Sequence, residues 1–222
     1  HSLLPGPHAL KIRKMTGQTA VPVLVLDGRA INDSTRIIEA LERAYPDPPL
    51  YPRDELARRR ALELEDFFDE ELGPHVRRLV FYHLGPRADV FIAMFGQESG
   101  PAARTALRLV FPALRAMMKK RLRIDEEGAE LSRRKTLAAL DRIERELRPS
   151  GYLVGDSFTV ADLSAAALLS PLVTPPEFPY PLPRAVPRSL VDFRGSLAGR
   201  RAFQWALETY RHHRGRSEAI AG

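Results

Sequence analysis

A serine and an aspartate stand where the sequence predicts the start of a helix. Asn32, Asp33 and Ser34 carry side chains that cap helices, and apolar residues with helical spacing follow them. A serine at a helix N-terminus presents its hydroxyl and the free N–H groups of the first turn, and the helix dipole favours negative charge there. The sequence therefore indicates an anion site at Ser34, with a purely structural cap as the alternative.

A proline marks the other end of the same stretch. Pro22 begins a five-residue apolar run, PVLVL, and proline cannot donate a hydrogen bond inside a sheet. Pro22 is therefore expected at the start of a strand or after an unusual peptide bond. In both cases the backbone of Val21 differs from that of an ordinary strand residue.

Other residue types with chemical potential are few. The chain has no cysteine, so it offers neither a thiol nucleophile nor a disulfide. His75 and His83 have no partner at metal-ligand spacing, and we expect no metal site.

The elements that position Pro22 and Ser34 are predicted to be a hairpin and a helix. The order from Val21 to Ile31 is an apolar run, the dipeptide Asp27-Gly28 and an apolar-polar alternation, which is a strong hairpin signal. A helix is expected from about Thr35 to Ala44. The prolines of residues 45–54, YPDPPLYPRD, then stop the helix and form a stiff connection.

The rest of the chain has helical periodicity and predicts a helical bundle. Thr159 and Asp162 have the spacing of a capping box, worth ~1 kcal/mol or somewhat more. An irregular proline-rich stretch is expected over residues 171–187, and a closing helix from about Gly199 to His212. Residues 1–18 are expected to hold the end of one strand and a short connection.

Charge and composition are those of an ordinary globular protein. The chain of 222 residues has a net charge of +6, but its basic residues are dispersed among acidic ones, so we expect no nucleic-acid partner. No apolar stretch approaches the roughly 20 residues that cross a bilayer, and no signal peptide is visible. We therefore expect a cytoplasmic protein without a membrane partner.

Three motifs in the right order resemble the cytosolic glutathione transferase superfamily. VPVLVLDG, residues 21–28, resembles the third and fourth strands of its thioredoxin-like domain. INDSTRIIEALERAYPDPPLYP, residues 31–52, resembles the third helix and the linker, and YLVGDSFTVADL, residues 152–163, resembles the capping segment of the helical domain. The resemblance implies an α+β chain with an incomplete thioredoxin-like domain over residues 1–46, a linker over 47–54 and an all-helical domain over 55–222.

The resemblance also implies roles for the residues of the first motifs. In the family the Val-Pro bond is cis and the backbone before the proline pairs with the cysteinyl part of glutathione, which by position assigns Val21 and Pro22. Ser34 inherits the γ-glutamyl carboxylate, Asp33 the ligand's amino group, and Gln18 a weaker contact. Glutathione is then a co-substrate, no metal is needed, and a homodimer is expected.

A second, hydrophobic substrate is expected against the helical domain. The aromatic candidates, for this pocket or for the core, are Phe67, Phe68, Phe81, Tyr82, Phe91 and Phe95. Among them we select Phe68, Phe81 and Tyr82.

The catalytic residue is left open by the sequence. In the family a tyrosine, serine or cysteine near the start of the chain acts on the thiol, at positions of the first strand and first helix that this chain is expected to lack. Ser2 lies too late to take that place. The resemblance therefore supports a transferase acting on a small electrophile, with a non-enzymatic binding protein or a helical scaffold as alternatives.

Overall fold

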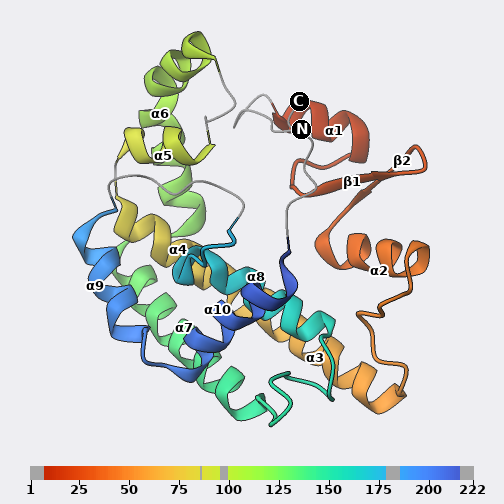
Figure 1. Ribbon diagram of the computed structural model, residues 1–222. Helices are drawn as coiled ribbons and strands as arrows, with labels where there is room; N and C mark the ends of the chain where they lie inside the picture. The colour runs from red at the N-terminus through yellow and green to blue at the C-terminus, as the bar shows by residue number, and fades with distance from the viewer. Residues whose placement is uncertain (1–7, 86, 96–99, 179–185, 216–222) are drawn as a thin grey trace.

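A small mixed part packs on a bundle of helices in the computed structural model, which describes residues 8–85, 87–95, 100–178 and 186–215 (Figure 1). The small part contains helix α1 (His8–Thr16), strands β1 (Val23–Leu26) and β2 (Arg29–Asn32), and helix α2 (Ser34–Ala44). The fold is therefore α+β and mostly helical.

The helical part follows in chain order. Its helices are α3 (Glu55–Glu71), α4 (Gly73–Leu84), α5 (Ala88–Phe95), α6 (Pro101–Leu122), α7 (Glu126–Glu146), α8 (Val160–Val173), α9 (Arg188–Leu197) and α10 (Arg201–His213). No helix in the described ranges is long and apolar enough to cross a membrane.

The hairpin forms as its turn residues predict. Asp27 and Gly28 have positive φ angles of 50° and 77°, which is the backbone of a type I′ turn. The strands are antiparallel, with Leu26 opposite Arg29 and Val23 opposite Asn32. The turn therefore fixes which residues meet at the open end of the hairpin.

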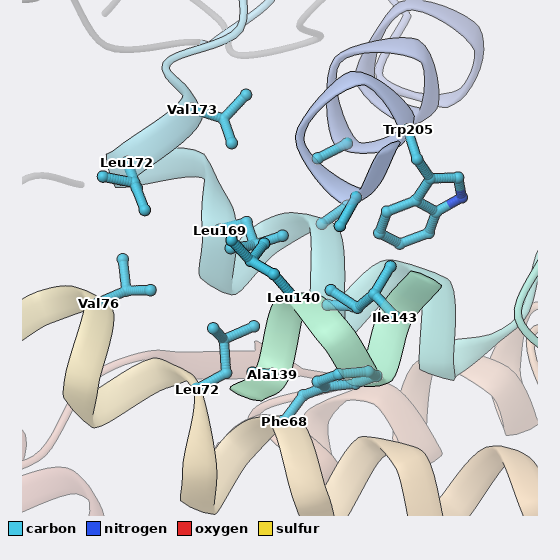
Figure 2. Packing of buried hydrophobic residues seen from close by; sticks show 14 of the residues in the cluster. Phe68, Leu72, Val76, Ala139, Leu140, Ile143, Leu169, Leu172, Val173 and Trp205 are labelled. Atoms are coloured by element: carbon cyan, nitrogen blue, oxygen red, sulfur yellow. The ribbon is translucent and has the colours of Figure 1, made fainter. Parts of the chain in front are cut away.

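The core lies in the helical part and has α8 at its centre. Helix α8 contacts α3, α4 and α10, and apolar residues occupy most of its circumference, as expected for a buried helix. Its Leu169 and Leu172 belong to one buried cluster with Phe68 of α3, Leu140 of α7 and Trp205 of α10, all labelled in Figure 2. Four of these five residues are fully enclosed, and Trp205 is 5% exposed.

Two expectations about helix positions are wrong. Residues 8–16 form α1 instead of the end of a strand, because Ile12 is buried, basic residues occupy the last turn and Gly17, with φ 75°, ends the helix. The stretch expected to be irregular over residues 171–187 is helical from Pro171 to Val173, and its residues 179–185 lie outside the described residues. The buried side chains of Leu172 and Val173 hold the last turn of α8 despite the proline.

Candidate functional site

The open end of the hairpin brings the two ends of the 19–35 stretch together. Val23 and Asn32 are paired at the open end of the antiparallel hairpin. Pro22 and Asp33 therefore follow on from the same end of the two strands. Antiparallel partners lie about 4.5 to 5.5 Å apart at their Cα atoms. Val21 and Ser34, one residue further out on each side, are therefore presented at one end of the small part.

The backbone of Val21 is exposed and has no hydrogen-bond partner among the described residues. The Val21–Pro22 peptide bond is cis, and Val21 is 61% exposed. Within the described residues no hydrogen bond is made by the N–H or the C=O of Val21. The amide of Gln18 pairs with the backbone of Ala20, and its Nε2 donates to the Ala20 carbonyl at 3.1 Å. Gln18 therefore holds the backbone just before Val21.

Asp33, and not Ser34, caps helix α2. Asp33 has φ 76° and its Oδ1 accepts from the N–H of Arg36 at 3.3 Å, so Ser34 is the first helical residue. The N–H groups of Ser34 and Thr35 have no hydrogen-bond partner in the described part of the chain, as is usual in a first turn. The Ser34 hydroxyl is exposed beside them. This end of α2 offers hydrogen-bond donors to an anion.

A buried carboxyl group fixes the first turn of α2 to the helical part. The hydroxyl of Thr35 donates to Oε1 of Glu65 in α3 at 2.8 Å. Glu65 is 3% exposed, and its Oε2 has no partner. Burial raises the pKa of Glu65, and the hydrogen bond from Thr35 offsets part of that rise.

The connection after α2 is held in the same way. The carboxylate of Glu42 accepts from the N–H groups of Leu50 and Tyr51 at 3.0 and 3.1 Å, and the Leu50 carbonyl accepts from the N–H of Val160 at 2.9 Å. Burial, together with the negative charge of Glu65, raises the pKa of Tyr51 to about 12. Polar contacts thus join α2, the connection and α8.

A cavity of about 230 Å³ lies where the end of α4 meets α5 and α6. Phe81 and Tyr82 line it, as do Phe91 and Phe111, whose ring centroids are 5.4 Å apart. Phe68 does not line this cavity, because it is fully buried in the core.

The remaining aromatic candidates have other surroundings. Phe67 lies under the guanidinium of Arg142, which is 5.5 Å from its ring centroid. The side chain of Phe95 lies outside the described residues. The structure therefore brings Phe81, Tyr82 and Phe91 to one cavity and leaves Phe67 and Phe68 away from it.

Two family models match two separate parts of the chain. The model described as "Glutathione S-transferase, N-terminal domain" matches residues 1–49, and the one described as "Glutathione S-transferase, C-terminal domain" matches residues 126–195. The chain belongs to the cytosolic glutathione S-transferase superfamily. The small part corresponds to the thioredoxin-like N-terminal domain of this family, and the helical part corresponds to its C-terminal domain.

Individual relatives agree with this assignment. A probable maleylacetoacetate isomerase from Caenorhabditis elegans is 26% identical over 193 residues, which are 85% of this chain and 73% of the relative. The crystal structure of the beta-etherase LigF from Sphingobium sp. strain SYK-6 is 22% identical with a TM-score of 0.56, covering 91% of this chain and 83% of that one.

A third relative was crystallised with a glutathione derivative. This glutathione S-transferase from Methylobacterium radiotolerans, in complex with glutathione sulfonate, is 24% identical with a TM-score of 0.42 and covers 88% of this chain and 76% of that one.

His75 and His83 are parts of the helical packing. His75 Nδ1 lies 3.0 Å from the hydroxyl of Ser132, and the ring of His83 stacks on Phe193 with centroids 5.5 Å apart. Burial lowers the pKa of both histidines. No group of three or more metal-ligating side chains occurs in the ranges that the structure describes.

Sequence reasoning missed Glu65 and its contact with Thr35. The signal was present, because Glu65 lies on the same helical face as Ala61 and Phe68, which are core residues. A carboxyl group on an apolar face requires a polar partner or a raised pKa. The pattern marks the position, but only the fold identifies Thr35 as the partner.

Proposed function

We propose that this protein binds glutathione at the open end of the hairpin and uses it on a small hydrophobic electrophile. The observation that supports this most directly is the convergence of the free Val21 backbone with the N-terminus of α2. A tripeptide needs both a strand-like backbone partner and a site for its carboxylate. These two features stand next to each other here.

The cysteinyl and γ-glutamyl parts of glutathione each have a matching group. The N–H and C=O of Val21 pair with the cysteinyl backbone in the manner of an added strand. The Ser34 hydroxyl and the free N–H groups of the first turn of α2 bind the γ-glutamyl carboxylate, which the helix dipole also favours. The exposed carboxylate of Asp33 attracts the ligand's amino group.

The second substrate is proposed to occupy the cavity lined by Phe81 and Tyr82. Its walls are aromatic and aliphatic, which suits a hydrophobic body. The reaction is proposed to be attack by the glutathione thiolate, with conjugation, as in detoxification, or isomerisation as the outcome. A protein that binds glutathione without turnover is the alternative.

Calorimetric titration with glutathione tests the binding site. Wild-type protein is expected to bind, and Ser34→Ala to weaken binding about tenfold or more, since a hydrogen bond to a charged group contributes about 1.5 to 3 kcal/mol. Ser157→Ala, at an exposed serine elsewhere, is the matched control. The dipeptide Cys-Gly lacks the γ-glutamyl group, so its weaker binding should not respond to Ser34→Ala.

Two results would contradict the proposal. If millimolar glutathione leaves the melting temperature unchanged, the proposed site does not bind it. A ligand at 100 times its Kd should raise the free energy of unfolding by about 2.7 kcal/mol. Equal loss of glutathione and Cys-Gly binding in Ser34→Ala would show that the γ-glutamyl carboxylate is not held there. Product formation with a panel of electrophiles then separates the enzyme from the binding protein.

We also propose that two copies associate and that the protein is cytoplasmic. Leu109, Ala113 and Met117 share one outer face of α6, and Leu109 and Met117 are 79% and 55% exposed. An apolar strip of this kind favours contact with another surface. Light scattering of wild type and of Leu109→Ser/Met117→Ser tests the association, and cell fractionation tests the location.

A further inference from the structure

Helix α6 is basic along its whole length. Its 22 residues contain six arginines and lysines and no acidic residue: Arg104, Arg108, Arg115, Lys119, Lys120 and Arg121. The long helices α3 and α7 differ in composition, because they also contain glutamates, some of which pair with arginines one turn away. Examples are Arg59 with Glu55 in α3 and Arg142 with Glu146 in α7.

Two of the basic residues of α6 line the aromatic cavity. Arg115 and Lys119 are four residues apart and therefore on one face, and both are among the residues that enclose the space beside Phe81 and Phe111. Neither side chain has an ion-pair partner in the described part of the chain.

The third cation of the cavity is already paired. Arg87 makes two hydrogen bonds with Asp89, from Nη2 to Oδ2 at 2.7 Å and from Nε to Oδ1 at 3.3 Å. No carboxylate is among the described lining residues. The cavity therefore combines apolar walls with two uncompensated positive charges at one side.

We propose that the ligand of this cavity is a compact aromatic or alicyclic molecule with an anionic group, such as a carboxylate or sulfonate. The body contacts Tyr82, Phe91 and Phe111, and the anion is held by Arg115 and Lys119. A guanidinium presents paired donors that match a carboxylate, and its hydrogen bonds to an anion are charge-assisted. The volume of about 230 Å³ lies below the usual range of roughly 300 to 1,000 Å³ for ligand pockets, which favours a small ligand.

The role of this ligand as second substrate rests on the proposed function, whereas its binding does not. Binding is therefore measured without glutathione. A cavity that prefers the anion while glutathione fails to bind would refute the proposed function alone. If glutathione binds but the cavity shows no preference for the anion, only the proposal of an anionic ligand is refuted.

The test compares 2-naphthoate with 2-naphthamide, which has nearly the same shape and no charge. Calorimetry on wild-type protein is expected to give at least about tenfold tighter binding of the acid. Arg115→Gln/Lys119→Gln should abolish this preference and leave the affinity for the amide nearly unchanged. Both residues are exposed, so the double variant is expected to keep the wild-type melting temperature.

Arg108→Gln/Lys120→Gln is the matched control, because it removes the same charge from exposed positions of α6 that do not line the cavity. It should retain most of the preference for the acid. Equal affinity of wild type for acid and amide, or no binding of either, would overturn the proposal. An equal loss of preference in both double variants would also overturn it, because the general field of α6 would then be responsible.

Discussion

Asp162 holds the start of the central helix, and its removal should be among the most damaging single changes. The carboxylate is fully buried. Its Oδ2 accepts from the N–H and the hydroxyl of Thr159 at 2.9 and 2.8 Å, and its Oδ1 accepts from the N–H of Leu153 at 2.8 Å. One side chain therefore closes the capping box of α8 and also fixes the loop in front of it.

The expected loss is larger than that of a helix cap. Loss of a cap costs ~1 kcal/mol. Asp162→Ala also leaves the N–H groups of Leu153 and Thr159 without partners, and both residues are at most 2% exposed. An unsatisfied buried donor costs about 1 to 3 kcal/mol, so the free energy of unfolding should fall by about 3 to 7 kcal/mol in total. For a chain of this size that corresponds to a melting temperature lower by roughly 6 °C or more.

Thermal and urea unfolding, monitored by circular dichroism, give the measurement. Burial raises the pKa of Asp162, because the charged form is poorly solvated there. Asp162→Asn keeps one acceptor oxygen and buries no charge, so it should lose clearly less stability than Asp162→Ala. Asp156→Ala, at an exposed aspartate six residues earlier, is the control. The reasoning is refuted if Asp162→Ala and Asp156→Ala unfold at the same temperature, or if the loss is no greater than that of a cap.

Two further predictions concern charged groups. Because burial raises the pKa of Glu65 above 4.5, the folded state resists its ionisation, and this group's contribution to stability is lost as the pH rises from that value through the raised pKa. Glu65→Gln can still accept from Thr35, so its melting temperature should exceed that of wild type at neutral pH and approach it in acid, whereas the exposed Glu70→Gln should show no such trend. Arg200 donates to the Glu144 carboxylate from Nε and Nη2, both at 2.9 Å, so Arg200→Ala should lower the free energy of unfolding by about 1 to 2 kcal/mol in urea titrations. Arg200→Lys should recover only part of this loss, and full recovery would show that charge alone matters.

Local signals predicted the parts of the fold that local chemistry determines. Asp27 and Gly28 adopt positive φ because their turn requires it, and neighbouring residues carry that information. The helical spacing of the apolar residues Ala61, Leu64 and Phe68 likewise predicted the buried face of α3. All three residues are fully buried in the structure.

The errors occurred where tertiary contacts outweigh local preference. Pro171 lacks an N–H and normally ends a helix, but the core around Leu172 and Val173 holds one more turn. The capping of α2 was ambiguous among Asn32, Asp33 and Ser34, and the backbone at Asp33 decided it.

The sequence could mark only those candidate site residues that lie close together in the chain. The sequence marked Val21 and Ser34 because they lie within one short hairpin-helix unit. Arg115 and Lys119 belong to a cavity that forms only where α4, α5 and α6 meet, so no local pattern distinguishes them from the other basic residues of α6.

The N-terminus of α2, the end proposed to bind glutathione, depends on the helical part for its position. A two-stranded sheet is marginal by itself, and here it is the only sheet within the described residues. Polar contacts instead run from the cap of α8 to α2: Val160 donates to the carbonyl of Leu50, and Glu42 of α2 accepts from the N–H of Leu50. Thr35 adds a second attachment through Glu65, next to Ser34 itself. The first turn of α2 is therefore oriented by contacts with α3 and α8 as well as by the hairpin.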